Sequence, residues 1–151
     1  VSASHTVIFN EGLRARFEAY LESCELNGGH VFAFPAVEAA YSNGTEWLEQ
    51  LLSYIQGNID YVTDYIHTHM PKIKVIVPMA SYLVWLDCRD LKLSQEALND
   101  WFVSKAHLAL NDGKTFGKEG IGFMRMNIGS PRSILEQAMK QLHSAYQQLP
   151  E

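Results

Sequence analysis

The sequence predicts an α/β fold: a small, mainly antiparallel sheet with helices packed on one face, preceded by a long bridging helix and the helical tail of a larger domain. Three observations predict it. Apolar residues recur at helical spacing through one long segment that ends before Pro71, short alternating apolar runs follow Pro71, and a last helical stripe begins at Ile134. We therefore expect the sheet to form in the second half of the chain.

Composition and charge restrict the function of the chain. Its 151 residues are 47% hydrophobic and 19% charged, which is enough apolar material for a globular core. The net charge is −5 and the basic residues are scattered, so the sequence lacks the basic patch that a nucleic-acid partner requires. No apolar run approaches about 18 residues and no export signal is present, so we expect no membrane partner. Cys24 and Cys88 are expected to be reduced thiols in a cytoplasmic protein.

In the first part of the chain, residues 1–9 include β-branched and small side chains and predict the last strand of a sheet. Asn10 is expected to cap a helix over 11–26, which an Asn-Gly-Gly run ends. Pro35 is expected to open a brief helix over 36–41, followed by a Ser-Asn-Gly turn.

A long helix over 45–70 is expected next, with Thr45 as its cap. Its length is on the order of 37 Å, more than one compact piece of this size needs. Its apolar stripe consists of Leu48, Leu51, Leu52, Ile55, Ile59, Val62, Tyr65 and Ile66. We therefore expect three parts: the tail of a larger domain over 1–44, the bridging helix over 45–70, and a small C-terminal domain over 71–151.

The elements expected after Pro71 all belong to the small domain. Strands over 73–77 and 82–86 are expected to pair as a hairpin, and Ser94 is expected to cap a helix that reaches Lys105. The remaining predicted elements are a short strand over 107–110, a turn over 111–113, a strand over 121–128, and a final helix opened by Ser130 and Pro131.

Arg125 lies in the middle of the last predicted strand. Alternation places Ile121, Phe123, Arg125 and Asn127 on one face of that strand and Gly122, Met124, Met126 and Ile128 on the other. A guanidinium keeps its charge, so among apolar neighbours it needs a carboxylate or a phosphate in a two-pronged hydrogen bond. Two interpretations are open, namely an internal ion pair with an acidic residue such as Asp87 and the carboxylate of a ligand.

Three other features have structural interpretations. His67 and His69 are two positions apart on a helix, point in different directions and therefore predict no metal site. The glycines from Gly113 to Gly122 lack the spacing of a phosphate loop and predict a turn that lets the backbone approach a substrate. The Ser-Pro helix start at 130–131 is interpreted as capping, with anion binding as the alternative.

Several segments carry a family resemblance. In chain order they are NEGLRARFEAY (10–20), AVEAAYSNGTEWL (36–48), WLEQLLSYIQGNIDYV (47–62), PMASYLVWLDCRDLKLS (78–94) and NDGKTFGKEGIGFMRMNIGSPRSILEQAM (111–139). Together they resemble the C-terminal portion of the class I/II aminotransferases, which are fold-type-I enzymes that depend on pyridoxal phosphate. The likeness is greatest to the branch of cystathionine β-lyases and related carbon-sulfur lyases, and it covers nearly the whole chain. It departs at Met79-Ala80-Ser81-Tyr82, where many relatives have Glu-Gly-Thr-Tyr.

The resemblance implies a role for Arg125. In the family pattern Phe-x-Arg-x-Asn, the arginine binds the α-carboxylate of the amino-acid substrate, and Phe123, Arg125 and Asn127 match that pattern. The chemistry is consistent with this role, because a planar fork of N–H groups fixes the orientation of a carboxylate as a single ammonium group does not.

The resemblance also implies what this chain lacks. The lysine that forms the Schiff base with the cofactor, and the aspartate and tyrosine that contact the cofactor ring, belong to a portion before Val1. None of the following lysines has the sequence context of the family's Schiff-base lysine: Lys72, Lys74, Lys92, Lys105, Lys114 and Lys118. We therefore expect no catalytic, cofactor-binding or metal-binding residue in the chain, which alone would neither bind pyridoxal phosphate nor turn over substrate. The complete enzyme is expected to be a homodimer that binds pyridoxal phosphate, with His30 to Tyr41 near the dimer contact.

The predicted function is therefore that of a C-terminal fragment of a pyridoxal-phosphate-dependent aminotransferase or carbon-sulfur β-lyase acting on an amino acid. Transamination and β-elimination are both compatible with the residues. Two alternatives come from other classes of protein: a non-catalytic module that binds amino acids through Arg125, and a dimerisation module built on the long helix.

Overall fold

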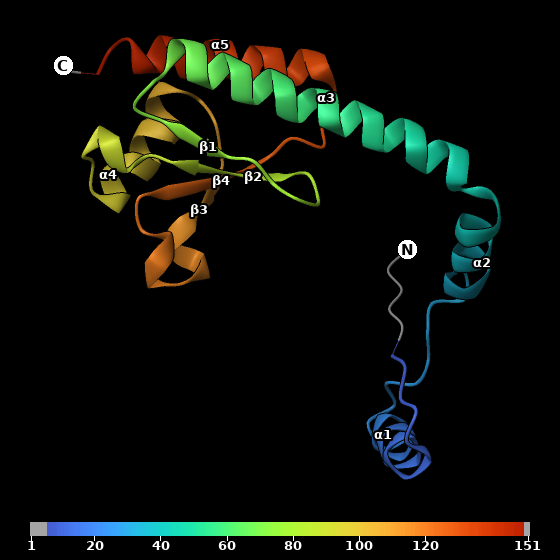
Figure 1. Ribbon diagram of the computed structural model, residues 1–151. Coiled ribbons are helices and arrows are strands. Elements are labelled where there is room, and N and C mark those ends of the chain that lie inside the picture. Colours follow the sequence, from blue (N-terminus) through green and yellow to red (C-terminus); the bar gives the residue numbers. More distant parts are fainter. Residues whose placement is uncertain (1–5, 150–151) are drawn as a thin grey trace. The chain divides into compact units, whose positions relative to one another are not determined.

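The structure is a computed structural model that describes residues 6–149. The chain forms two compact units, one up to Gln50 and the other from Leu51 onward. Figure 1 shows the elements of both units in chain order.

The first unit contains α1 (Glu11–Ser23), α2 (Ala33–Asn43) and the start of α3 (Thr45–His69). The Asn10 side chain accepts a hydrogen bond from the Leu13 N–H at 2.9 Å, which confirms the predicted cap. The helix ends earlier than predicted, at Ser23 instead of residue 26. The reason is a left-handed Glu25 (φ 56°), which turns the chain so that the Leu26 N–H bonds back to the Leu21 carbonyl at 2.9 Å.

Three further expectations for this unit differ from the structure. The brief helix expected over 36–41 is longer, Ala33–Asn43, and Pro35 lies within its first turn. Residues 1–5 of the predicted first strand lie outside the described part of the chain, and residues 6–9 form no strand in the described part. A strand requires a neighbour that accepts and donates its backbone hydrogen bonds, and no neighbouring strand is described beside residues 6–9. Thr45 is the first helical residue of α3 instead of its cap, and the Gly44 carbonyl accepts from the Leu48 N–H at 2.9 Å.

The second unit contains a sheet of four strands. They are β1 (Lys74–Ile76), β2 (Leu83–Asp87), β3 (Asn111–Asp112) and β4 (Phe123–Asn127), and they lie in the order β1-β2-β4-β3. Every neighbouring pair is antiparallel, so the predicted α/β fold with a small antiparallel sheet and the predicted β1–β2 hairpin are confirmed.

The prediction for residues 107–113 was wrong. Residues 107–110 form no strand, and the strand lies at Asn111 and Asp112, where a turn was expected. His107 adopts a left-handed conformation (φ 54°) that interrupts the extended run, whereas Asn111 pairs with Arg125 on β4. The reversal of the chain follows instead in two short 3₁₀ turns, Gly113–Phe116 and Lys118–Gly120.

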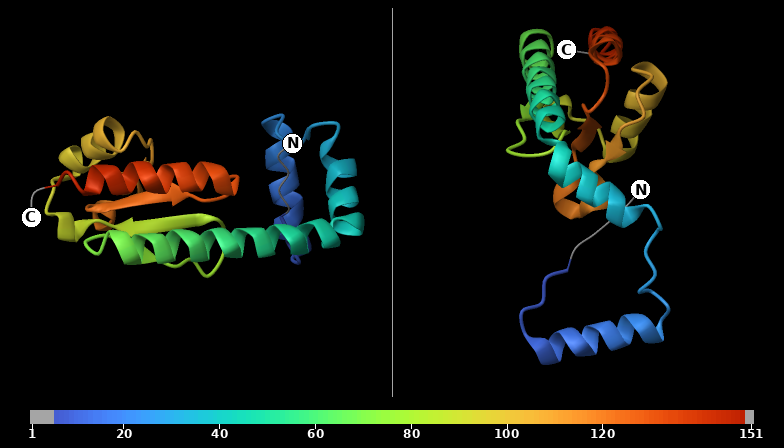
Figure 2. Two further views of the ribbon diagram at one scale, coloured as in Figure 1. Left: turned by 90° about the horizontal axis from the view of Figure 1, so that it is seen from above. Right: turned by 90° about the vertical axis from the view of Figure 1, so that its right-hand side faces the viewer.

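Helices cover one face of the sheet. These are α3, α4 (Gln95–Asp100, continued by a π-helical turn over Trp101–Lys105) and α5 (Arg132–Tyr146), with one further 3₁₀ turn at Arg89–Leu91. The Ser94 hydroxyl accepts from the Ala97 N–H at 3.2 Å, as predicted for its cap. Figure 2 shows α3 and α5 together over the sheet. The two helices are parallel, because Asn58 contacts Arg132 and Tyr65 contacts His143.

The core lies between these helices and the sheet. Its main members are Val62, Ile66, Val84, Leu86, Leu98, Phe102, Met124, Met126, Leu135, Met139 and Leu142. The alternation predicted for β4 is confirmed, since Met124 and Met126 are buried in this core while Phe123 and Arg125 lie on the opposite face.

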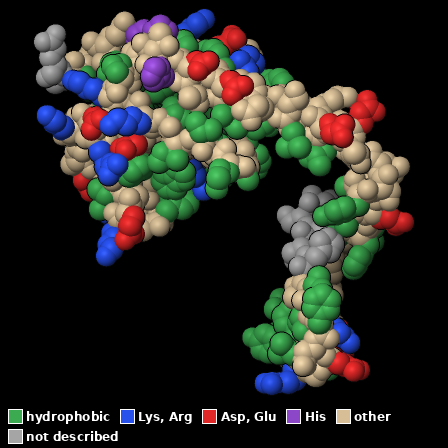
Figure 3. Space-filling view, viewed as in Figure 1, with side chains coloured by type: hydrophobic (Ala, Val, Ile, Leu, Met, Phe, Trp, Pro, Cys, Tyr) green, Lys and Arg blue, Asp and Glu red, His purple; other side chains and the backbone are tan. Residues whose placement is uncertain are grey.

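The N-terminal helices carry much exposed apolar surface. Within α1 no residue is buried, and Leu13, Phe17 and Tyr20 are exposed. Figure 3 shows hydrophobic side chains at the surface of α1 and α2. Across residues 6–149, the helices that are described are either too short or too polar to cross a membrane.

Candidate substrate-binding site

The outer face of the sheet presents a row of side chains that crosses all four strands. Ile76 pairs with Trp85, Trp85 with Arg125, and Arg125 with Asn111. Because directly paired residues on an antiparallel sheet point to the same face, these four side chains lie side by side. The only charged member of the row is Arg125.

Arg125 is held by two neighbours. Its Nη2 donates a hydrogen bond to Asn111 Oδ1 at 3.1 Å, and its Cζ lies 4.4 Å from the centre of the Phe116 ring. Its Nε atom is buried and has no hydrogen-bond partner among the described residues. The guanidinium therefore keeps N–H donors that the described part of the chain does not satisfy.

The interpretation of Arg125 as one half of an internal ion pair was wrong. Asp87 accepts two hydrogen bonds from the Arg89 guanidinium, at 2.9 Å from Nε and 2.7 Å from Nη2. These hydrogen bonds lower the pKa of Asp87. Arg125 takes part in none of the four ion pairs found among residues 6–149.

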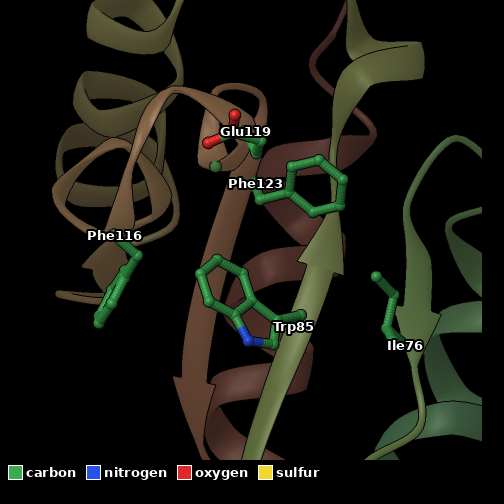
Figure 4. Close-up of a pocket in the computed structure, with 6 residues that line it drawn as sticks. Ile76, Trp85, Phe116, Glu119 and Phe123 are labelled. Carbon is green, nitrogen blue, oxygen red and sulfur yellow. The ribbon is translucent and has the colours of Figure 1, made fainter.

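An apolar hollow lies next to this row. It has a volume of about 320 Å³ and is lined by Ile76, Trp85, Phe116, Glu119, Gly120 and Phe123. Figure 4 shows Trp85 on β2 between Phe116 and Ile76, with Phe123 on the neighbouring strand. The Trp85 ring contacts Phe116 and Phe123 edge to face, with centroid distances of 5.3 and 6.2 Å. The hollow and the guanidinium share Phe116 as a neighbour, so the guanidinium is aromatic-lined on that side.

Two amides of α4 hold the segment that supplies Asn111 and Phe116. Gln95 is buried, and its Oε1 accepts from the Gly122 N–H at 2.6 Å while its Nε2 donates to Asp112 Oδ1 at 2.7 Å. Asn99 donates to Asp112 Oδ2 at 2.6 Å. Sequence reasoning missed this cluster. The available signal was the spacing of four between two amides, which places both on one face of a helix.

Asn58 on α3 holds the other end of β4, and it was also missed. Its Nδ2 donates to the carbonyls of Ile128 and Ser130 at 2.9 and 3.0 Å, and its Oδ1 accepts from Arg132 Nε at 2.9 Å. Its side chain is fully buried. The signal in the sequence was a polar residue directly beside the apolar stripe of a long helix. Asn127 Oδ1 accepts from the Gly129 N–H at 2.8 Å, and the Arg125 guanidinium bonds to Asn111 instead of Asn127.

The other residues singled out in the sequence lie elsewhere. The His69 ring stacks on His143 of α5 with a centroid distance of 4.9 Å, whereas His67 lines a hollow beside Lys74. The two histidines therefore have different neighbours, as their spacing predicted. At the predicted capping site before α5, the Tyr54 hydroxyl accepts from the Arg132 N–H at 2.7 Å, and Pro131 precedes the helix without a side-chain cap.

The lysines lie at the surface of the structure. Every lysine of the chain is exposed, and Lys74, Lys114 and Lys118 are paired with Asp90, Glu96 and Glu119. A Schiff-base lysine instead needs a pocket that lowers the pKa of its amine.

Known proteins share both the sequence and the fold of this chain. It is 37% identical to cystathionine β-lyase PatB of Bacillus subtilis (strain 168) over 145 residues, which are 96% of this chain and 38% of that protein. Its fold matches a pyridoxal-phosphate-bound putative aminotransferase from Clostridium difficile 630 with a TM-score of 0.89 and 38% identity, over 93% of this chain and 36% of that one.

A second solved structure agrees. Cystalysin from Treponema denticola, which contains pyridoxal 5'-phosphate, matches with a TM-score of 0.85 and 30% identity, over 95% of this chain and 36% of that one. No model of a known protein family matches the chain. The chain spans less than two fifths of the length of these proteins. The family resemblance inferred from the sequence is confirmed.

Proposed function

Because the chain matches the C-terminal portion of a class I/II aminotransferase, we propose that it completes a pyridoxal-phosphate-dependent enzyme in which Arg125 binds the α-carboxylate of an amino-acid substrate. The observation that supports this role is a guanidinium on the outer face of the sheet with free N–H donors and no carboxylate partner among residues 6–149. A two-pronged hydrogen bond to a substrate carboxylate would use the Nη donors that Asn111 leaves free and would orient the substrate.

The rest of the enzyme follows from the same assignment. Residues 1–44 are the tail of the large cofactor-binding domain, residues 45–70 are the bridging helix, and residues 71–151 are the small domain. α1 exposes an apolar face, which supports the proposal that this tail packs against another part of the enzyme. A helix of 13 residues with no buried side chain is marginal in water on its own. Pyridoxal phosphate would be bound by residues outside this chain, and the enzyme would be a cytoplasmic homodimer.

Two reactions fit this assignment. β-Elimination is favoured by the name of the Bacillus relative, a cystathionine β-lyase, and transamination by the name of the Clostridium structure, a putative aminotransferase. Release of ammonia from a cysteine S-conjugate would identify elimination, whereas transfer of the amino group to a 2-oxo acid would identify transamination.

The carboxylate role is tested in the complete enzyme that carries this chain. Replacing Arg125 by Ala removes a charge-assisted hydrogen bond and should lower kcat/KM for an amino acid by about 10- to 100-fold. Arg125→Lys should also lower it, because an ammonium group cannot form the planar fork. Arg89→Lys is the matched control. Arg89 pairs with Asp87, so this substitution should leave kcat/KM unchanged. An unchanged kcat/KM in Arg125→Ala would contradict the proposal.

The isolated chain distinguishes the alternative modules. Titration calorimetry with an amino acid should detect no binding, because half of the pocket is outside the chain. Binding that disappears in Arg125→Ala would instead indicate an amino-acid-binding module. Self-association that rises with protein concentration, without ligand binding, would indicate a dimerisation module.

A further inference from the structure

We infer that Asn111 and Phe116 are positioning residues that aim the Arg125 guanidinium, and that Gln95 holds the segment that carries them. This inference deepens the proposed function, since it rests on Arg125 as the carboxylate-binding group. Neither Asn111 nor Phe116 is assigned a direct contact with substrate. Their effect is transmitted through the orientation of one side chain.

Asn111 restrains Arg125 without neutralising it. Its Oδ1 accepts one N–H of the guanidinium at 3.1 Å, and an amide oxygen carries no net charge. An aspartate at the same position would form an ion pair with Arg125 and compete with the substrate carboxylate for the same donors. A neutral acceptor therefore fixes the fork while leaving its charge available to a ligand.

Phe116 restrains the guanidinium in a second direction. Its ring lies under the guanidinium, with Cζ 4.4 Å from the ring centre, and Trp85 supports the ring from the side at 5.3 Å. An aromatic face attracts a cation and covers one side of the guanidinium plane. The hydrogen bond sets the rotation of the fork and the ring sets its plane, so a carboxylate has to approach from the remaining open edge.

One buried side chain determines where both restraints lie. Gln95 bonds to Asp112 at the beginning of the connecting segment and to Gly122 at its end, so a single amide holds both ends. Asn99 adds a second bond to Asp112. The segment between these points carries Phe116, and Asn111 directly precedes Asp112. A change at Gln95 should therefore move both neighbours of Arg125 together.

The chain itself provides a test that needs no activity. With the arginines labelled by ¹⁵N, the Nη groups of Arg125 should give separate NMR signals, because the hydrogen bond and the ring slow rotation of the guanidinium. Asn111→Ala and Phe116→Leu should merge these signals, whereas Lys114→Gln, an exposed control in the same segment, should leave them unchanged. Identical spectra for the wild type and Asn111→Ala would overturn the inference.

The complete enzyme tests the consequence for binding. The quantity to measure is the ratio of kcat/KM for an amino acid to that for the amine that lacks its carboxylate. Asn111→Ala should lower this ratio about 3- to 10-fold through KM, in line with the loss of one hydrogen bond. Asn111→Asp should lower it further. Gln95→Met should lower it as well, provided that thermal unfolding shows the variant to be folded.

The two proposals fail in different ways. If Arg125→Ala leaves the ratio unchanged, Arg125 does not bind the carboxylate and the proposed function fails. The NMR comparison still reports whether Asn111 and Phe116 restrain the orientation of the Arg125 guanidinium. If Arg125→Ala lowers the ratio but Asn111→Ala and Asn111→Asp do not, the proposed function stands and the positioning role is overturned.

Discussion

Gly113 and Gly120 face each other so closely that a Cβ added to either would overlap the carbonyl oxygen of the other. They lie at the two ends of the consecutive 3₁₀ turns that connect β3 to β4. This close backbone approach brings the chain back onto β4 and leaves Phe116 next to Arg125.

Gly113→Ala should therefore destabilise the second unit by about 1–3 kcal/mol, the usual cost of a forced overlap in a packed site. Urea unfolding measures it. Gly28→Ala is the matched control, because a Cβ at Gly28 meets no atom within 4 Å. Equal unfolding midpoints for the two variants would contradict the close approach.

Asn58→Ala should destabilise the second unit by about 2–3 kcal/mol, because it leaves one buried and one partly buried carbonyl without their donor. Chemical denaturation followed by the tryptophan signal measures the loss. Gln56→Ala is the control on the same helix, since Gln56 is exposed and bonds only to Asp60. A loss no larger than that of Gln56→Ala would show that Asn58 does not anchor the start of α5.

Asp87→Asn should reduce stability at neutral pH and make it less sensitive to acid. The Arg89 guanidinium lowers the pKa of Asp87 through its hydrogen bonds, so the stabilisation is complete above the ordinary aspartate pKa of about 3.9. It is lost as the pH falls through the lower pKa of the folded state. Thermal unfolding from about pH 7 to pH 2 should show the curves of wild type and variant converging in acid. If the difference in stability between the wild type and Asp87→Asn stayed constant across this range, the pH dependence could not come from Asp87.

Cys88 should resist alkylation in the folded protein, whereas Cys24 should react. Burial, and to a lesser extent the charge of Asp87, raises the pKa of the Cys88 thiol to about 12, and its side chain is buried, while Cys24 is exposed. At about pH 8 the thiolate fraction of Cys88 is on the order of 10⁻⁴. Mass spectrometry after iodoacetamide should find one label on the native chain and two after denaturation. Two labels on the native chain at similar rates would contradict the buried position.

Local patterns were predicted well because their causes lie within a few residues. The caps at Asn10 and Ser94 each satisfy an N–H three residues later, and the period of the long apolar stripe required no knowledge of its neighbours. The strand at Asn111 was missed because it exists only where β4 lies beside it. The anchoring roles of Gln95 and Asn58 were missed because their partners lie 17 to 74 residues away.

The sequence by itself determined that Arg125 shares one face of its strand with Phe123 and lies opposite Met124 and Met126, because side chains of a strand alternate with a period of two. Only the tertiary structure decided what that guanidinium meets. Asp87 is one strand away, but it pairs with Arg89, and the neighbours of Arg125 are Asn111 and Phe116. The direction of a side chain follows from the local backbone, whereas its partner follows from strand register and from the closure of distant segments, which no local pattern specifies.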